Sequence, residues 1–281
     1  MLWRGRRQSE NIEDRRGFGG RGIAIGGGLG GIVVLLLALL FGADPQQLLE
    51  QLPSNNPGSS APTSQTTNPE EEELKQFVSV VLAETEDVWT SRFSEVNRQH
   101  RKPTLVLFRD SVSSACGQAG AAVGPFYCPA DEKLYIDLSF FRELRSRFRA
   151  PGDFAIAYVV AHEVGHHVQN LLGTMERVNS IQRQTNEERA NALSVRLELQ
   201  ADFYAGVWAH YAQQRCIVEP GDVEEALSAA SAVGDDRLQR ESQGYVVPDS
   251  FTHGTSEQRA GWFNRGLGTG DLRQGDTFGE R

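Results

Sequence analysis

The residues best suited to chemistry are His162, Glu163 and His166, which form the pattern HExxH. Residues four apart share one face of an α-helix, so both imidazoles can reach one cation through a ring nitrogen. Glu163 falls one step round the helix, where it can accept a proton from a metal-bound water without binding the metal itself. The pattern therefore predicts a catalytic site with one zinc ion per chain.

The sequence around this motif predicts a buried helix. Residues 155–161 are apolar apart from one tyrosine hydroxyl, with Asp153 as a candidate N-cap and Gly173 as a C-terminal stop. Two histidines and a carboxylate would be costly in a core without partners, and a bound metal removes that cost. The neighbouring His167 points about 100° away from His166 around the helix. We do not expect it to be a ligand.

A catalytic zinc site needs a third protein ligand and one open position. The longer motif HExxHxxGxxH is excluded, because Gln169 and Leu172 stand where Gly and His are required. The next predicted helix, residues 186–213, carries Glu198 and Asp202 four apart on one face. We expect Glu198 to complete the metal site and Asp202 to accept the second ring N–H of a zinc-bound histidine. The alternative is that both are solvated acids on an amphipathic helix.

These motifs resemble those of a known family. HExxH followed by a separate ExxxD helix is the gluzincin pattern, and the chain is similar to the bacterial neutral zinc metallopeptidases in the segments AHEVGHHVQ, ELQADFYAG, EPGDVEEAL, GDD and SFTHGTSEQR. The resemblance covers residues 152–266, and the stretches CGQAG and GPFYCPADEKLYIDLSFF upstream also fit. It implies a zinc metallopeptidase in which His162, His166 and Glu198 bind zinc, Glu163 is the catalytic acid/base and Asp202 supports a zinc-bound histidine.

A further histidine is the candidate for stabilising the oxyanion that forms during peptide hydrolysis. His253, in THGTSEQR, is similar to the THPxxxxR segment of membrane-linked heat-shock zinc proteases, with Gly254 in place of Pro. We expect His253 to share the developing negative charge with zinc. The alternative is an ordinary helix cap, with Arg259 in surface contacts. Two tyrosines are weaker candidates, more typical of core aromatics: Tyr158 and Tyr204.

Strand-like segments precede the predicted metal helix at residues 104–108 and 133–138. Helical patterns cover residues 70–97 and 140–148. The expected fold class is therefore an α+β domain, predominantly helical and zincin-like. We also expect residues 133–138 to form an edge strand that pairs with an extended peptide substrate through main-chain hydrogen bonds.

Residues 22–43 predict a transmembrane helix. They contain no polar side chain, and about 20 such residues span the hydrocarbon core of a bilayer. A buried core helix is disfavoured by the Arg-rich and Pro/Ser/Asn-rich flanks. A cleaved signal peptide is disfavoured because Phe41 stands where a small residue is wanted. The glycines spaced four apart would either pack one helix against another or simply reflect sequence that membranes tolerate.

The charge distribution predicts how the chain is oriented in the membrane. The whole chain has a formal net charge of -9, which excludes a generally basic nucleic-acid binder. Residues 1–21, however, carry six Arg against three acidic residues, so the positive-inside rule places them in the cytoplasm. Everything after residue 43 would then be extracytoplasmic.

Cysteine usage agrees with an oxidising compartment. Cys116 and Cys128 are close in sequence with glycines between them, and a disulfide is favoured over the alternative of two buried thiols. Cys216 is expected to be a buried small hydrophobe.

Five regions follow from these patterns: a basic cytoplasmic terminus (1–21), a transmembrane helix (22–43), a disordered Pro/Ser/Asn linker (44–69), a zinc metallopeptidase domain (70–267) and a flexible tail (268–281). The sequence predicts a single-pass membrane protein that hydrolyses peptide bonds of a peptide or protein substrate. The alternative is a catalytically silent zinc-binding scaffold in the cell envelope. Glu163 favours the enzyme, because a scaffold does not need a general base. No oligomeric state is predicted.

Overall fold

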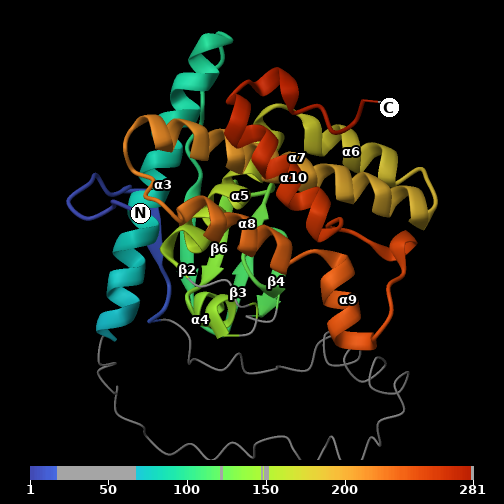
Figure 1. The fold of residues 1–281 in the computed structure, drawn as a ribbon, viewed down its shortest axis with the longest axis horizontal. Helices are drawn as coiled ribbons and strands as arrows, with labels where there is room; N and C mark the ends of the chain where they lie inside the picture. The colour runs from blue at the N-terminus through green and yellow to red at the C-terminus, as the bar shows by residue number, and fades with distance from the viewer. Residues whose placement is uncertain (18–67, 121–122, 147, 149–151, 280–281) are drawn as a thin grey trace, which may run out of the picture. The chain divides into compact units, whose positions relative to one another are not determined.

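A four-stranded mixed sheet forms one layer of the protein, whose computed structural model describes residues 1–17, 68–120, 123–146, 148 and 152–279 (Figure 1). Its strands lie in the order β1 (Ile12–Asp14), β2 (Thr104–Phe108), β6 (Lys133–Asp137) and β5 (Phe126–Cys128). β1 and β6 pair parallel to β2, and β5 pairs antiparallel to β6. The side chains of β2 and β6 are almost all buried, which explains their nearly continuous apolar sequences.

The expectation that residues 133–138 form an edge strand is wrong. β6 lies between β2 and β5 and pairs on both sides of its backbone. The edge of the sheet on this side is β5 instead. The apolar pattern marks β6 as a strand, but the identity of its neighbours depends on contacts between distant segments.

The helices make the larger part of the structure and confirm a predominantly helical α+β fold. α5 (Asp153–Leu171) is central and packs against four other helices and strands β5 and β6. The remaining α-helices are α3 (Pro69–Glu95), α4 (Ser139–Ser146), α6 (Thr174–Gln182), α7 (Glu187–Gln214), α8 (Asp222–Ala232), α9 (Asp235–Gln243) and α10 (Ser256–Thr269). Two short 3-10 helices follow α9 and α10: η2 (Pro248–Ser250) and η3 (Leu272–Gln274).

Asparagine side chains cap the N-termini of two of these helices. The Asn68 side chain accepts from the backbone N–H of Glu70 to cap α3, and Asn186 caps α7 in the same way. Asp153 is not the N-cap of α5, because that position is taken by Gly152. Asp153 instead lies in the first turn of the helix.

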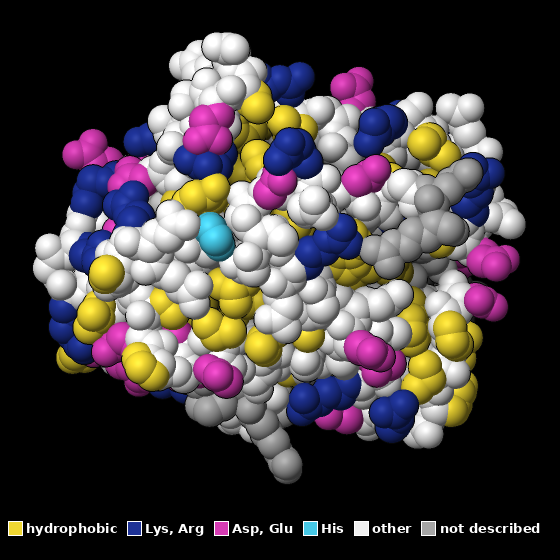
Figure 2. Space-filling view, turned by 45° about the horizontal axis from the view of Figure 1, so that its top comes forward, with side chains coloured by type: hydrophobic (Ala, Val, Ile, Leu, Met, Phe, Trp, Pro, Cys, Tyr) yellow, Lys and Arg dark blue, Asp and Glu magenta, His cyan; other side chains and the backbone are white. Residues whose placement is uncertain are grey.

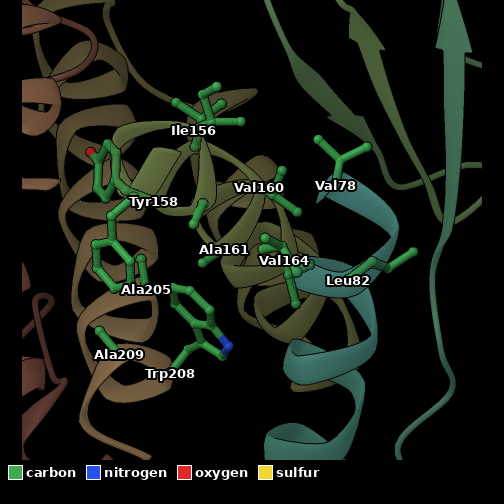
Figure 3. Packing of buried hydrophobic residues seen from close by; sticks show 14 of the residues in the cluster. Val78, Leu82, Ile156, Tyr158, Val160, Ala161, Val164, Ala205, Trp208 and Ala209 are labelled. Atoms are coloured by element: carbon green, nitrogen blue, oxygen red, sulfur yellow. The ribbon is translucent and has the colours of Figure 1, made fainter. Parts of the chain in front are cut away.

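The main hydrophobic core surrounds α5 (Figure 3). Val160 and Val164 of α5 face α3. On the α7 side of α5, the ring of Phe154 stacks on that of Trp208, with 5.6 Å between the ring centroids. Each large apolar side chain buried in this way contributes about 1.5–3 kcal/mol. α5 is therefore held on several sides, which makes it a rigid support for the HExxH residues.

Residues 1–17 are part of this same folded unit. Strand β1 extends the sheet, and the backbone N–H of Leu2 donates to the carbonyl of Ile217. All five arginines in this segment form ion pairs: Arg4, Arg6, Arg7, Arg15 and Arg16. Their carboxylate partners lie within the segment itself or on α3. Five of the six arginines that the sequence analysis assigned to positive-inside topology are thus paired with carboxylates of the domain, and the sixth, Arg21, lies outside the described residues.

The sequence analysis places residues 1–21 in the cytoplasm and the domain on the opposite side of a membrane, and this placement remains a prediction. In the structure, residues 1–17 and 68–279 belong to one compact unit. No helix among the described residues is long and apolar enough to cross a bilayer. The predicted transmembrane helix, residues 22–43, lies outside the described residues, as does nearly all of the predicted linker.

The α-ammonium of Met1 lies buried in a group of carboxylates at the start of α5. It is 3.0 Å from Asp153 Oδ1, 2.9 Å from Glu219 Oε2 and 3.2 Å from Asp222 Oδ1. Burial alone would lower the pKa of this ammonium, but its hydrogen bonds to Glu219 and Asp153 raise the pKa from 8.0 to about 10. The N-terminal charge therefore joins the first residue of the HExxH helix to the loop before α8.

Raising the pH should weaken this contact. The folded-state pKa lies above the ordinary value, so the stabilisation is present below pH 8 and lost as the pH rises through 10. We expect the melting temperature to fall by about a few degrees between these values. A chain with an acetylated N-terminus should melt lower at pH 7 and show a smaller fall. Circular dichroism measures the melting temperature of both chains. An equal fall in the two chains would contradict this role for Met1.

Cys116 and Cys128 form the expected disulfide. It joins the hairpin of β3 (Ser111–Ser114) and β4 (Gly117–Gly120) to edge strand β5. The expectation for Cys216 is wrong, because this thiol is exposed just after the end of α7.

The end of the chain is also more ordered than predicted. α10 continues to Thr269, and the Thr277 hydroxyl donates to the carbonyl of Arg196 on α7. The Gln200 side chain donates to the carbonyl of Gly275. Residues 268–279 therefore pack on the domain, because a backbone carbonyl and a side chain of α7 supply hydrogen-bonding partners that glycine content does not reveal.

Candidate metal centre and active site

α5 and α7 bring the three predicted metal ligands together. Glu198 Oε2 lies 3.1 Å from His162 Nε2, and Glu198 Oε1 lies 3.3 Å from His166 Nε2. One ligand atom from each of the three residues lies within 4.8 Å of the others. A tetrahedral zinc ion with bonds of about 2.0–2.1 Å separates its ligand atoms by about 3.4 Å. The three residues therefore fit a zinc ion in spacing and in donor type.

Gly165 allows the two helices to approach this closely. A Cβ atom at this position would lie 2.8 Å from the carbonyl oxygen of Ala201 and 3.0 Å from its Cα. These are backbone atoms of a packed helix, which cannot rotate away as a side chain can. A larger residue at 165 would push α7, and with it Glu198, away from the histidines.

The charges in this group favour a cation between the three side chains. Burial alone would raise the pKa of Glu198, but the imidazoles of His166 and His162 hold it well below its usual range. Burial would lower the pKa of His162, yet Asp202 and Glu198 raise it to about 10. A field that attracts a proton to this position also attracts a divalent metal ion.

Asp202 contacts His162 at Nδ1, the ring nitrogen that faces away from the metal group. Its Oδ1 lies 2.8 Å from His162 Nδ1 and accepts a hydrogen bond of 2.6 Å from the Tyr158 hydroxyl. Burial would raise the pKa of Asp202, but the charges of Arg259 and His162 lower it. An anionic Asp202 holds the proton on Nδ1, so Nε2 presents its lone pair to the site. Tyr158 is a core aromatic with a hydrogen-bonded hydroxyl, as expected.

Arg259 is a site residue that the sequence analysis missed. Instead of making surface contacts, it is only 3% exposed and binds both oxygens of Asp202, with distances of 2.8 Å from Nε and 3.0 Å from Nη2. Its Nη2 also lies 3.8 Å from Glu198 Oε2. Arg259 therefore ties α10 to both acids of the ExxxD helix. Its one sequence signal is its place in the THGTSEQR segment.

Gln169 plays the corresponding part for the second histidine. Its Oε1 lies 2.9 Å from His166 Nδ1, and its Nε2 donates to the carbonyl of Leu197 at 2.7 Å. Sequence reasoning used Gln169 only to exclude the longer zinc motif. As expected, His167 stays out of the metal group, since its ring nitrogens face Tyr127 and the carbonyl of Arg101.

The metal group opens into a cavity of about 660 Å³. Glu163 lines this cavity beside His162 and His166 and is itself buried. Burial raises the pKa of Glu163, and the two histidines counteract only part of this rise. A carboxylate with a raised pKa is a stronger base at neutral pH than an exposed glutamate.

His253 lines the same cavity and is held by Asp235. The Nδ1 atom of His253 lies 3.2 Å from Asp235 Oδ1, and Asp235 Oδ2 accepts from three successive backbone N–H groups, those of residues 252–254. Gly254 has a φ of +89°, which a proline cannot adopt, and this explains why glycine replaces the proline of the similar segment. Asp235 is another residue that the sequence analysis did not single out.

The whole chain matches one family model. Residues 1–278 match the family described as "Putative neutral zinc metallopeptidase". The chain belongs to this family. The zinc that the family description implies agrees with the His162, His166 and Glu198 group. The neutral zinc metallopeptidase match also includes residues 1–17, which the structure places inside the domain.

Relatives of this chain occur in Escherichia coli and Mycobacterium tuberculosis. The chain is 48% identical to the uncharacterized protein YpfJ of Escherichia coli strain K12, with 100% of this chain and 99% of YpfJ covered. It is 42% identical to the uncharacterized protein Rv2575 of Mycobacterium tuberculosis, with 86% and 85% covered. No solved structure matches the chain.

Proposed function

We propose that this protein is a zinc-dependent metallopeptidase of the gluzincin type that hydrolyses peptide bonds. The observation that carries the proposal is the meeting of Glu198 with His162 and His166 at spacings that suit one zinc ion, beside Glu163 in an open cavity. When bound, zinc supplies a Lewis acid that polarises the peptide carbonyl and lowers the pKa of water.

The side chains around the cavity transfer protons, stabilise the oxyanion and orient the two histidines. Glu163 takes a proton from water as the oxygen adds to the carbonyl carbon, and returns a proton to the amide nitrogen as the C–N bond breaks. His253, held by Asp235, donates to the oxyanion as charge develops. Asp202 and Gln169 keep the two imidazoles in fixed orientation throughout.

Edge strand β5 is the proposed support for the substrate, in place of β6. Phe126 and Tyr127 of β5 line the cavity, and the β5 backbone has no strand partner on its outer side among the described residues. An extended peptide can add to such an edge through main-chain hydrogen bonds. Apolar side chains on the other walls suit a hydrophobic residue of the substrate: Phe140, Phe148, Val159 and Leu238.

Metal removal tests the proposed activity. Treating the purified chain with a zinc chelator should abolish cleavage of an unfolded protein, and added zinc should restore it, because ligands and base remain in place. Fragments are followed by mass spectrometry. Cleavage that persists after zinc is removed would contradict the proposal, while a zinc-loaded chain inert toward a broad peptide library would favour the scaffold.

We further propose attachment to the cell membrane through residues 22–43, with residues 1–17 and 68–279 together on the extracytoplasmic side. The apolar run supports attachment, and the Cys116–Cys128 disulfide supports an oxidising compartment. On the face shown in Figure 2, basic, acidic and apolar side chains are interspersed. A thiol reagent that does not cross membranes should label both Cys216 and a cysteine introduced by Gln8→Cys in intact cells. Labelling of one alone would contradict the shared side.

A further inference from the structure

A second cavity, also of about 660 Å³, lies between α6, α7 and the C-terminal segment 272–279. The α7 residues Arg196, Gln200 and Tyr204 line it. Gln200 is two positions beyond Glu198, which is about 200° around the helix. The cavity is therefore separate from the proposed active site and faces the other side of α7.

The walls of this cavity are strongly basic, although the whole chain has a net charge of -9. Four arginines and one acid line it: Arg177, Arg189, Arg196, Arg273 and Asp276. Arg273 is paired with Asp271, and Arg196 Nη1 donates to the carbonyl of Phe278 at 3.2 Å. Arg177 and Arg189 form no ion pair with any residue that the structure describes. Both arginines are exposed, and their guanidinium groups border the cavity without a paired carboxylate, while Asp276 is the one acid in the lining.

A buried donor without a partner points to a ligand in the same place. Tyr204 is only 5% exposed, and its hydroxyl makes no hydrogen bond to the described part of the chain. Burial, and to a smaller degree the charge of Asp276, raises the pKa of Tyr204, so the hydroxyl keeps its proton. A hydroxyl in this setting normally finds an acceptor when the site is filled.

We propose that this cavity binds an oxyanion of the phosphate class, held by Arg177, Arg189 and Arg196 with the Tyr204 hydroxyl as an additional donor. Guanidinium groups match the geometry of phosphate oxygens and bind them through paired N–H donors. Three arginines suit a divalent oxyanion better than a single carboxylate, because one guanidinium group is enough to bind a carboxylate through two N–H donors. The ligand is either free inorganic phosphate or a phosphate monoester.

Calorimetric titration of the full chain tests this site. Inorganic phosphate and glycerol phosphate are each titrated at constant ionic strength into wild type and into the double variant Arg177→Gln/Arg189→Gln. We expect the double variant to bind phosphate at least about tenfold more weakly, since each lost charge-assisted hydrogen bond costs affinity. The probe that binds wild type more tightly identifies the free or the esterified form.

The matched control removes two positive charges elsewhere. Arg183 and Arg240 are exposed, line neither cavity and form no ion pair within the described residues, so Arg183→Gln/Arg240→Gln should keep wild-type affinity within about twofold. Tyr204→Phe keeps the ring but loses the hydroxyl, so it should bind phosphate at least about threefold more weakly than wild type. Phosphate also binds zinc, but every variant keeps the metal group. A difference in affinity between the variants therefore reports binding in the cavity. Equal affinity in wild type and the cavity double variant, or equal loss in the control, would overturn the proposal.

Discussion

Replacing Glu163 by glutamine should leave the zinc content at about one ion per chain and lower peptide hydrolysis by about 10²–10⁴-fold. Glu163 lies in the cavity beside His162 and His166, but the metal group consists of the two histidines and Glu198. Glutamine has nearly the same shape as glutamate and cannot accept the proton. Binding of metal and activation of water therefore depend on different side chains, and the variant separates them.

The matched control for this variant is Glu176→Gln, because Glu176 is an exposed acid on α6. It should keep wild-type activity and zinc content. If Glu163→Gln hydrolyses peptides at the wild-type rate, Glu163 is not the base. If it loses zinc as well, the separation of roles proposed for α5 is wrong.

Replacing Arg259 by methionine should destabilise the fold by about 3–5 kcal/mol. The change leaves the carboxylate of Asp202, which is 0% exposed, without its main positive partner. Asp202 would then take up a proton or shift, and His162 would lose its fixed orientation. Loss of such support typically weakens metal affinity by about 10–100-fold. Urea unfolding and competition with a zinc chelator measure the two effects.

Two further variants distinguish this role from simple loss of a charge. Arg259→Lys should recover only part of the zinc affinity, because an ammonium cannot bind both oxygens of Asp202 in the same planar geometry. Arg240→Met removes an exposed arginine and should leave stability and zinc affinity unchanged. Equal stability of Arg259→Met and wild type would show that Arg259 does not support Asp202.

The metal group is the part of the protein that sequence reasoning predicts best. His162 and His166 share a helical face, as do Glu198 and Asp202, because local spacing along one helix determines which side chains lie together. The residues Asp235, Arg259 and Gln169 escape such reasoning. Their partners lie on other elements, or their side chains have no metal-binding chemistry of their own, so only the packed helices reveal their roles.

The N-terminal segment shows a different limit. The amino-acid composition of this segment is the same whether its arginines lie beside a membrane or pair with carboxylates of a folded domain. In the structure Arg16 pairs with Asp14 and Glu72, and β1 adds a strand to the sheet next to β2. A three-residue strand and ion pairs between segments more than 50 residues apart leave no periodic pattern in the sequence.

The most direct test of the central claim is the zinc content of the purified chain and of its Glu198→Ala variant, measured side by side by elemental mass spectrometry after equal dialysis. If α5 and α7 jointly hold the ion, wild type should retain about one zinc per chain and the variant very little, because a two-histidine site binds far more weakly. Equal zinc in the two proteins, or none in either after zinc is supplied, would contradict the account.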